Sequence, residues 1–546
     1  MNVISKYFNT LKYLKFSQFY NRFIFKFTNP KVSLEDWKIR ELEDWKNKGF
    51  VNKVSFPKVK DVLFENNIFC FLNENKMIHV LRHKKDKPNI KNEKIIKDWN
   101  DKNINKLWLY NLHYFDFLRQ ENITYEQSLF WIEKWIDENK IGFGNGWEPY
   151  TLSLRIVNWI KFYLAGNKLN DKIIKYLALQ TEFLSKKLEY HLLANHLLAN
   201  AKALVFAGMF FKGEMSKKWL EKGIEIYNKQ LPEQILNDGG HFERSAMYHS
   251  IILEDLLDLK NISAPLELDS YIKKMINWLS VMTGPDEKIS LFNDAAFGIA
   301  LEPKELLNYA EQLGFKVRRQ ENSCDLFDVG YARLQKDNWT IFCDGAPLGP
   351  DYQLGHSHAD SLTFELWFKN ERLICDSGTK QYFNADIRKY QRGTSAHNTI
   401  VIDGKNSSEV WSAHRVAKRA KIVERNFDDN TFSATHNGYK PILHKRKWSF
   451  ENNEVCIDDF IIGKGTHIIE SFFHIHPSYD VDIKDCIVKI FNDANTFNIK
   501  VDKDMKVFVS DGTVSFEFGK EEKNKIVCFM KTVALPFNIK TTIGVL

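Results

Sequence analysis

Residues with the chemistry of metal ligands gather in the stretch LGHSHADSLTFELWF. His356, His358 and Asp360 occupy alternate positions just before an apolar run typical of a buried strand, so in a strand they would share one face. Downstream, CDSGTKQY contains Asp376 and RGTSAHNTIVIDG contains His397. Two imidazoles and a carboxylate that converge from separate β-segments would suit Zn²⁺. The alternative is that these side chains cap turns or form ordinary hydrogen bonds, and the pattern alone leaves both readings open.

A second group of polar residues interrupts apolar helical segments. In EYHLLANHLLANAKAL, Asn195 and His196 lie in the middle of a strongly apolar run. Burying an amide and an imidazole costs free energy unless each finds a hydrogen-bond partner. Further along, DGGHFERSAMYH places Tyr248 at the start of another helix, where simple packing is the competing explanation.

Residues that suit sugar binding lie close to these groups. In GNGWEPYTLSLRIVNW, the Trp147 ring could stack on a sugar while the Arg155 guanidinium pairs with a carboxylate or sulfate. A satisfied salt bridge explains the same pattern equally well. The candidate substrate-binding residues are Trp147, Glu148, Tyr150, Arg155, His241, Glu243 and Arg244.

The elements that must position these residues divide the chain into regions. A chain of 546 residues is too long for one compact core. Residues 105–324 repeat apolar side chains at helical spacing, which predicts helical hairpins stacked as a solenoid or closed into an (α/α) toroid. In residues 325–546, short segments in which apolar and polar residues alternate are separated by Gly, Asp and Asn. This pattern predicts an antiparallel β-sandwich. Residues 1–104 combine a basic, aromatic segment with short strands, so the predicted fold is multidomain α+β.

Charge and hydropathy narrow the choice of partner. The chain has 77 Lys and Arg against 70 Asp and Glu, a balance of +7 that does not indicate nucleic acid and would not repel an acidic polymer. The basic, aromatic N-terminal segment could lie on an anionic membrane surface or pack on the body of the protein. No apolar run reaches bilayer length, and no secretory signal pattern is present. We expect a cytoplasmic location, with peripheral association at the inner face of the membrane through this segment as a further option.

Taken together, the motifs resemble those of the heparinase II/III-like family of polysaccharide lyases. The resemblance rests on the order NH in a helix, DGGHFERSAMYH, GHSHADSLTFEL, CDSG and AHNTIVIDG, and it covers roughly residues 105–420. The N-terminal LKYLKFSQFYNRFIFKF is similar to leaders on family members associated with bacterial capsule or O-antigen gene clusters. The resemblance implies a toroid joined to a β-sandwich, and a substrate that is an acidic polysaccharide. A lipid-linked oligosaccharide at the inner face of the membrane is a further candidate substrate, because no secretory signal pattern is present.

The resemblance also implies roles for single residues. Asn195 and His196 match the pair that faces the substrate carboxylate, Tyr248 matches the catalytic tyrosine, and His356 matches the β-domain histidine of the cleft. A second tyrosine from the β-domain is expected at Tyr382, with Tyr390 as the alternative.

The family's metal site has a counterpart as well. His358, Asp376 and His397 match its metal-binding triad, which implies a divalent metal, Zn²⁺, with a structural role.

These residue types suit β-elimination. A base removes the C5 proton of a uronic acid while the C4–O bond breaks, and the carboxylate must be neutralised to stabilise the developing charge. An amide and an imidazole supply those hydrogen bonds, and a tyrosine or histidine serves as acid or base. Two alternatives remain open: a glycoside hydrolase that uses Glu148 and Glu243, and a non-catalytic glycan-binding assembly protein.

Overall fold

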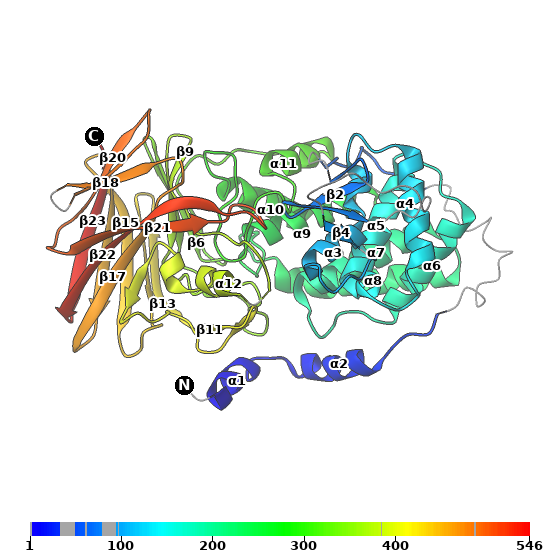
Figure 1. Cartoon of the computed structure of the whole chain (residues 1–546), viewed down its shortest axis with the longest axis horizontal. Coiled ribbons are helices and arrows are strands. Elements are labelled where there is room, and N and C mark those ends of the chain that lie inside the picture. The colour runs from blue at the N-terminus through cyan, green and yellow to red at the C-terminus, as the bar shows by residue number, and fades with distance from the viewer. Residues whose placement is uncertain are drawn as a thin grey trace.

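The computed structural model describes residues 3–32, 50–59, 63–78, 94–96, 98–383, 385–484 and 487–546. Figure 1 shows a helical part and a strand-rich part side by side, with the first two helices lying along one side of both. The predicted order, helical domain first and antiparallel β-domain second, is confirmed. No helix among the described residues combines the length and the apolar character needed to cross a membrane.

Capping and burial explain where the helices of the first part form. Asn105, Thr124, Asn170 and Ser245 each accept a backbone N–H at a helix start. The central helix α7 is buried on nearly every side because α5, α8 and α9 surround it. The helices of this part are α3 (Lys106–Tyr114), α4 (Tyr125–Glu138), α5 (Pro149–Leu164), α6 (Asp171–Ser185), α7 (Ala194–Phe210), α8 (Glu214–Gln234), α9 (Ala246–Asn261), α10 (Asp269–Val281) and α11 (Pro303–Gln312).

A small sheet packs against this helical part. Its strands are β1 (Phe64–Glu65), β2 (Ile68–Phe71), β3 (Glu74–Ile78) and β4 (Lys94–Ile96). Phe69 contacts Trp131 of α4 with ring centres 4.8 Å apart, and Phe71 contacts Trp108 of α3 at 5.2 Å. These aromatic contacts join the small sheet to the same hydrophobic core as the helices.

The β-domain begins with a five-stranded antiparallel sheet. Its order is β5-β6-β7-β8-β9, with strands Cys324–Leu326, Tyr331–Lys336, Trp339–Asp344, Phe364–Phe368 and Glu371–Ile374. Every residue of β8 is buried, as expected for a strand covered on both faces. The helix α12 (Asp386–Gln391) and the small ladder β11 (Val410–Trp411) with β12 (Arg415–Val416) follow at the edge facing the helical part.

Two further antiparallel sheets complete the domain. The four-stranded sheet has the order β10-β17-β22-β21, with strands Ile400–Ile402, Thr466–His474, Glu522–Ala534 and Lys506–Val514. The eight-stranded sheet has the order β13-β14-β15-β16-β23-β20-β19-β18, with strands Ile422–Asp428, Thr431–His436, Leu443–Glu451, Glu454–Ile462, Phe537–Val545, Thr496–Val501, Ile487–Phe491 and Asp480–Lys484. One buried hydrophobic cluster connects all three sheets, and it includes Phe364, Ile400 and Trp448. The domain is therefore a layered antiparallel assembly around a shared core.

Candidate active site

A cleft of about 1030 Å³ is lined by residues of both parts of the molecule. The five residues predicted to be catalytic all line it: Asn195, His196, Tyr248, His356 and Tyr382. The first three come from the helical part and the last two from the β-domain. These five residues, which span 187 positions of the sequence from Asn195 to Tyr382, therefore meet around one cavity.

Asn195 and His196 stand at the start of α7, where the chain bends sharply into the helix. Leu193 and Ala194 both have positive φ angles, 64° and 50°. The Asn195 amide donates to the Glu243 carboxylate at 2.8 Å, and His196 Nδ1 lies 3.2 Å from the carboxylate of Glu189. Burial lowers the pKa of His196, but Glu189 outweighs burial and raises that pKa above its usual value. An amide and an imidazole whose pKa is raised, which favours its cationic form, thus face the cleft together.

The two tyrosines approach each other from opposite sides of the cleft. Tyr248, in the first turn of α9, has its hydroxyl 3.0 Å from the hydroxyl of Tyr382, and its ring centre lies 4.1 Å from that of His356. Burial is the main cause that raises the pKa of both tyrosines well above the usual range. Both hydroxyls are therefore protonated near neutral pH, which suits a proton donor. Tyr390 does not line the cleft, and its hydroxyl is buried without a hydrogen-bond partner.

Asp294 connects the histidines of the β-domain and was not singled out from the sequence. Its Oδ2 is 2.9 Å from His356 Nδ1, its Oδ1 is 2.8 Å from His358 Nε2, and Arg388 donates to both of its oxygens. Burial raises the pKa of Asp294, but Arg388 and the two histidines outweigh burial and hold that pKa well below its usual value. A carboxylate only accepts hydrogen bonds, so His356 Nδ1 and His358 Nε2 are the protonated nitrogens. In the neutral form of each ring, His356 Nε2 and His358 Nδ1 are then the nitrogens with the lone pairs.

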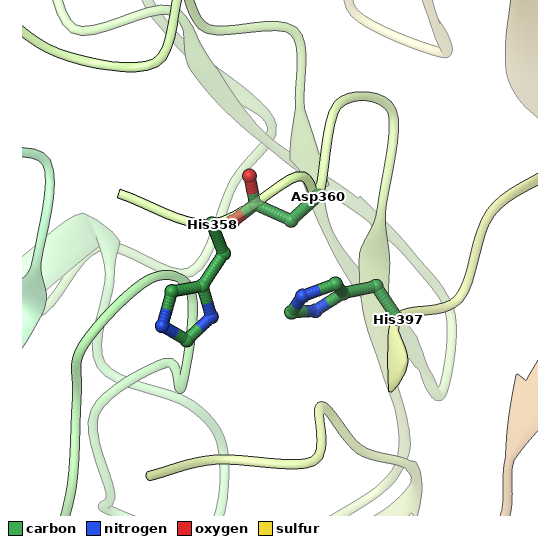
Figure 2. Close-up of side chains that lie close together, drawn as sticks. All are labelled: His358, Asp360 and His397. Atoms are coloured by element: carbon green, nitrogen blue, oxygen red, sulfur yellow. The ribbon is translucent and has the colours of Figure 1, made fainter. Parts of the chain in front are cut away.

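Three side chains form a candidate metal site behind the cleft. One ligand atom from each of His358, Asp360 and His397 lies within 4.8 Å of the other two. Figure 2 shows the two imidazoles approaching from separate segments, with the Asp360 carboxyl beside them. His358 Nδ1, Asp360 Oδ2 and His397 Nε2 are all buried and have no hydrogen-bond partner within the described part of the chain. Three orphaned donor atoms that converge in this way fit a divalent metal ion.

The protonation states of these residues respond to burial. Burial lowers the pKa of His358 to about 4 and raises that of Asp360 to about 6. Burial also lowers the pKa of His397, but Asp376 outweighs it and raises that pKa. A metal ion at this site would require the neutral form of His397, with Nδ1 donating to Asp376 and Nε2 available as a ligand atom.

The structure of this region differs from the expected arrangement at two points. His356, His358 and Asp360 do not lie in a strand, since the strand starts at Phe364 and they occupy the loop before it. The three converging residues include Asp360 and not Asp376, whose Oδ2 accepts from His397 Nδ1 at 2.7 Å, so a role of Asp376 as a metal ligand stays a prediction. Asp360 takes its place in the cluster, and Asp376 orients the imidazole from behind, as carboxylates commonly do for metal-binding histidines.

Of the residues predicted to bind substrate, some lie at the cleft and others lie in the core or beneath the cleft surface. Tyr150 lines the cleft, with its ring centre 4.5 Å from that of His196. Glu148 lies beside the cleft, where it accepts a hydrogen bond from Tyr110 and pairs with Lys106 at 2.9 Å. Both of these partners line the cleft.

Trp147 and Arg155 lie in the helical core instead of against a substrate. Arg155 has no exposed surface, and its guanidinium lies 3.7 Å from the ring centre of Trp135. It donates to Gln180 and to two backbone carbonyl oxygens, so an amide and the main chain satisfy it in place of an acidic sugar. Trp147 is buried against the rings of Trp135 and Phe183.

His241, Glu243 and Arg244 lie beneath the cleft surface, and none of them lines it. His241 Nε2 is 3.1 Å from Gln234, and Arg244 donates to the Val329 carbonyl at 2.8 Å. Only Glu243 reaches a cleft residue directly, through the amide of Asn195. These three residues therefore support the site from behind.

Family comparisons agree with this architecture. The family model described as "Heparinase II/III N-terminus" matches residues 82–312, and the model "Heparinase II/III-like, C-terminal" matches residues 318–542. Among solved structures, a heparinase III superposes with a TM-score of 0.68 at 19% identity, covering 97% of this chain and 90% of the other. A heparinase III described as the BT4657 gene product superposes with a TM-score of 0.60 at 20% identity, over 82% and 80% of the two chains.

Two curated relatives are named heparin-sulfate lyases. A heparin-sulfate lyase of Bacteroides stercoris is 27% identical over 50% of this chain and 44% of its own length. A heparin-sulfate lyase of Pedobacter heparinus is 24% identical over 64% of this chain and 57% of its own length. The chain thus spans about half the length of the curated relatives that it matches. The two family models together cover most of the chain, which belongs to the heparinase II/III-like family.

Proposed function

We propose that this protein is a polysaccharide lyase that cleaves an acidic, uronate-containing glycan by β-elimination. The observation that carries the proposal is the meeting of the Asn195 amide and the His196 imidazole with a second histidine and two tyrosines around one cleft. Curated relatives named heparin-sulfate lyases support the same reaction class.

Each group has a definite task in this reaction. Asn195 and His196 bind the uronate carboxylate and stabilise the charge that develops when C5 loses its proton. The base is His356 in its neutral form, in which Nδ1 donates to Asp294 and Nε2 has the lone pair that accepts the C5 proton. Tyr248 is the acid that protonates the departing O4, since burial keeps its hydroxyl protonated. Tyr382 holds that hydroxyl in place through the 3.0 Å contact.

Charge at the cleft supports an acidic substrate. Arg22 and Arg415 line the cleft, and neither has a carboxylate partner among the described residues. Guanidinium groups bind carboxylate and sulfate through paired hydrogen bonds. The candidate substrates are acidic glycans, among them capsule and O-antigen glycans and their lipid-linked precursors.

Zinc is the metal that we propose for the site formed by His358, Asp360 and His397. Two imidazoles and one carboxylate are a common zinc donor set. When bound, the ion would cross-link the loop before β8 to the segment before β10, next to the loop that carries His356. Its role in the proposal is structural.

The experiment is an absorbance assay on a panel of acidic polysaccharides. Elimination leaves an unsaturated uronate that absorbs in the ultraviolet, whereas hydrolysis shortens the chains without new absorbance. The hydrolase alternative has weaker support, because Glu243 is buried on Asn195 and Glu148 is held by Tyr110 and Lys106. Shortened chains without absorbance would overturn the lyase proposal, and binding without cleavage would favour an assembly role.

A further inference from the structure

Residues 3–32 form a strap that runs along the outside of the molecule. It contains α1 (Val3–Leu11) and α2 (Phe16–Phe27), which Figure 1 shows beside the β-domain and the helical part respectively. Tyr7 packs on Trp411 of the β-domain with ring centres 5.1 Å apart. Lys15 pairs with Glu233 of α8 at 2.5 Å. The strap is therefore anchored to both halves of the protein.

The inner face of the strap contributes to the cleft. Thr10, Leu11, Leu14 and Arg22 line the same cavity as Tyr248 and His356. Gln18, on the same side of α2, is almost fully buried. The strap is thus one wall of the candidate active site.

The outer face of α2 is an exposed aromatic stripe. Phe16, Phe19, Tyr20, Phe23 and Phe27 follow the spacing of one helix face. Phe16, Phe23 and Phe27 are 84%, 67% and 69% exposed, although large aromatic residues are among those most often buried. Phe8 extends the stripe onto α1 with 65% exposure. A contiguous apolar surface of this kind marks an interaction site.

The positive charge of the strap favours an anionic partner. Residues 1–34 contain Lys6, Lys12, Lys15, Arg22, Lys26 and Lys31 and no Asp or Glu. Lys12 and Lys26 are exposed and have no carboxylate partner within the described residues. Aromatic rings flanked by lysines match an anionic lipid surface, where the rings enter the headgroup region and the cations meet lipid phosphates. Pairing with a second copy would bring these like charges together, so the membrane is the better fit.

We propose that the strap binds an anionic membrane surface through this aromatic stripe and thereby holds the cleft at that surface. The inference rests on the proposed function only in taking the cleft as the substrate site. A glycan attached to a lipid would then meet Arg22 and the catalytic residues directly from the membrane side.

The test is co-sedimentation of the full chain with vesicles. The protein is expected to bind phosphatidylcholine vesicles that contain phosphatidylglycerol, and to bind pure phosphatidylcholine much more weakly. The variant Phe16→Ser/Phe23→Ser/Phe27→Ser is expected to lose this binding. Lys12→Ser and Lys26→Ser, which leave the apolar stripe intact, are each expected to weaken it about fivefold. A matched control, Ile462→Ser/Phe508→Ser, changes exposed apolar residues of the β-domain and is expected to bind like the unmodified protein.

Three results would overturn the inference: no binding to anionic vesicles, equal losses in the control variant, or a dimer that the triple variant converts to a monomer. Turnover of a soluble acidic polysaccharide separates this inference from the proposed function. The triple variant is expected to keep that turnover, because none of its three residues lines the cleft. If the unmodified protein binds anionic vesicles but turns over no acidic polysaccharide, the lyase proposal fails and the membrane inference stands.

Discussion

His356 and His358 bind opposite oxygens of one carboxylate, that of Asp294, at 2.9 and 2.8 Å. The first histidine faces the cleft and the second belongs to the candidate metal site. Because Arg388 keeps this carboxylate ionised, Asp294 sets the tautomer of both rings at once. Positioning of the proposed base and formation of the metal site therefore depend on the same buried residue.

Replacement of Asp294 by Asn tests this dependence. The amide no longer requires a donor at His356 Nδ1, so the proposed base populates the wrong tautomer. We expect kcat to fall by about 10²- to 10⁴-fold with a smaller change in KM. Bound metal, measured by mass spectrometry after gel filtration, is expected to fall as well. Unchanged kcat and unchanged metal content would show that Asp294 serves only the fold.

A matched control exists elsewhere in the β-domain. Asp459 is buried and accepts from Arg446 and from His444, which repeats the Asp294 arrangement away from the cleft. Asp459→Asn is expected to lose stability of similar size, about 3–5 kcal/mol for a broken buried pair. The folded fraction should keep its kcat, so activity loss specific to Asp294→Asn is separated from unfolding.

The tyrosine pair predicts a graded series of phenylalanine variants. Tyr248→Phe removes the proposed acid and is expected to lower kcat by at least about 100-fold. Tyr382→Phe removes only the partner hydroxyl, and the expected loss is about 1 kcal/mol of transition-state stabilisation. Tyr390→Phe deletes a buried hydroxyl that has no partner, so it should leave kcat unchanged and stability equal or higher. An equal loss at Tyr390 would reverse the assignment of the second tyrosine.

His196 predicts an alkaline limit on substrate binding. Its pKa is raised because Glu189 outweighs burial, so the ring is cationic at low pH and loses its charge as pH rises through that raised pKa. Its contact with Glu189 stabilises the fold fully below the usual histidine pKa and is lost over the same rise. We expect KM to increase on this alkaline side. In His196→Gln the pH dependence should flatten, and a profile identical to that of the unmodified protein would contradict the assignment.

The metal cluster predicts different outcomes for ligand and supporting residues. His397→Ala and Asp360→Asn remove donor atoms and are expected to abolish bound zinc. Asp376→Asn removes the carboxylate behind His397, so zinc affinity should fall by about 10- to 100-fold without being lost. Chelation should lower the melting temperature of the unmodified protein. His467→Ala, at a histidine–aspartate pair outside the cluster, is the control and should retain zinc.

The sequence brought together residues that line one cleft in the structure. Asn195, His196 and His356 are polar residues in or next to apolar elements, and the family resemblance connected them with Tyr248; their roles in the reaction stay predictions. Asp294 could not be found, because SLFNDAAFG has no distinctive spacing and its partners lie over 60 residues away.

Loop conformation explains the remaining differences. Asp376 accepts from His397 Nδ1, whereas Asp360 converges with His358 and His397, and sequence spacing does not encode this difference. Arg155 was predicted to bind an acidic sugar because it lies close to Trp147 in the sequence. Its actual acceptors are one side-chain amide and two backbone carbonyl oxygens, which cannot be identified from the sequence.

The two arginines Arg155 and Arg415 give the final test of how the cleft recognises acid. Arg155→Met removes a buried cation that makes three hydrogen bonds, so stability is expected to fall by about 3 kcal/mol or more while KM of the folded enzyme stays constant. Arg415→Ala removes an exposed guanidinium at the cleft and should raise KM by about tenfold or more. Its stability should change by only about 1 kcal/mol, since its contacts are with the rings of Trp411 and Tyr7. The opposite pattern, with KM sensitive to Arg155 and indifferent to Arg415, would move substrate recognition from the cleft wall into the helical core.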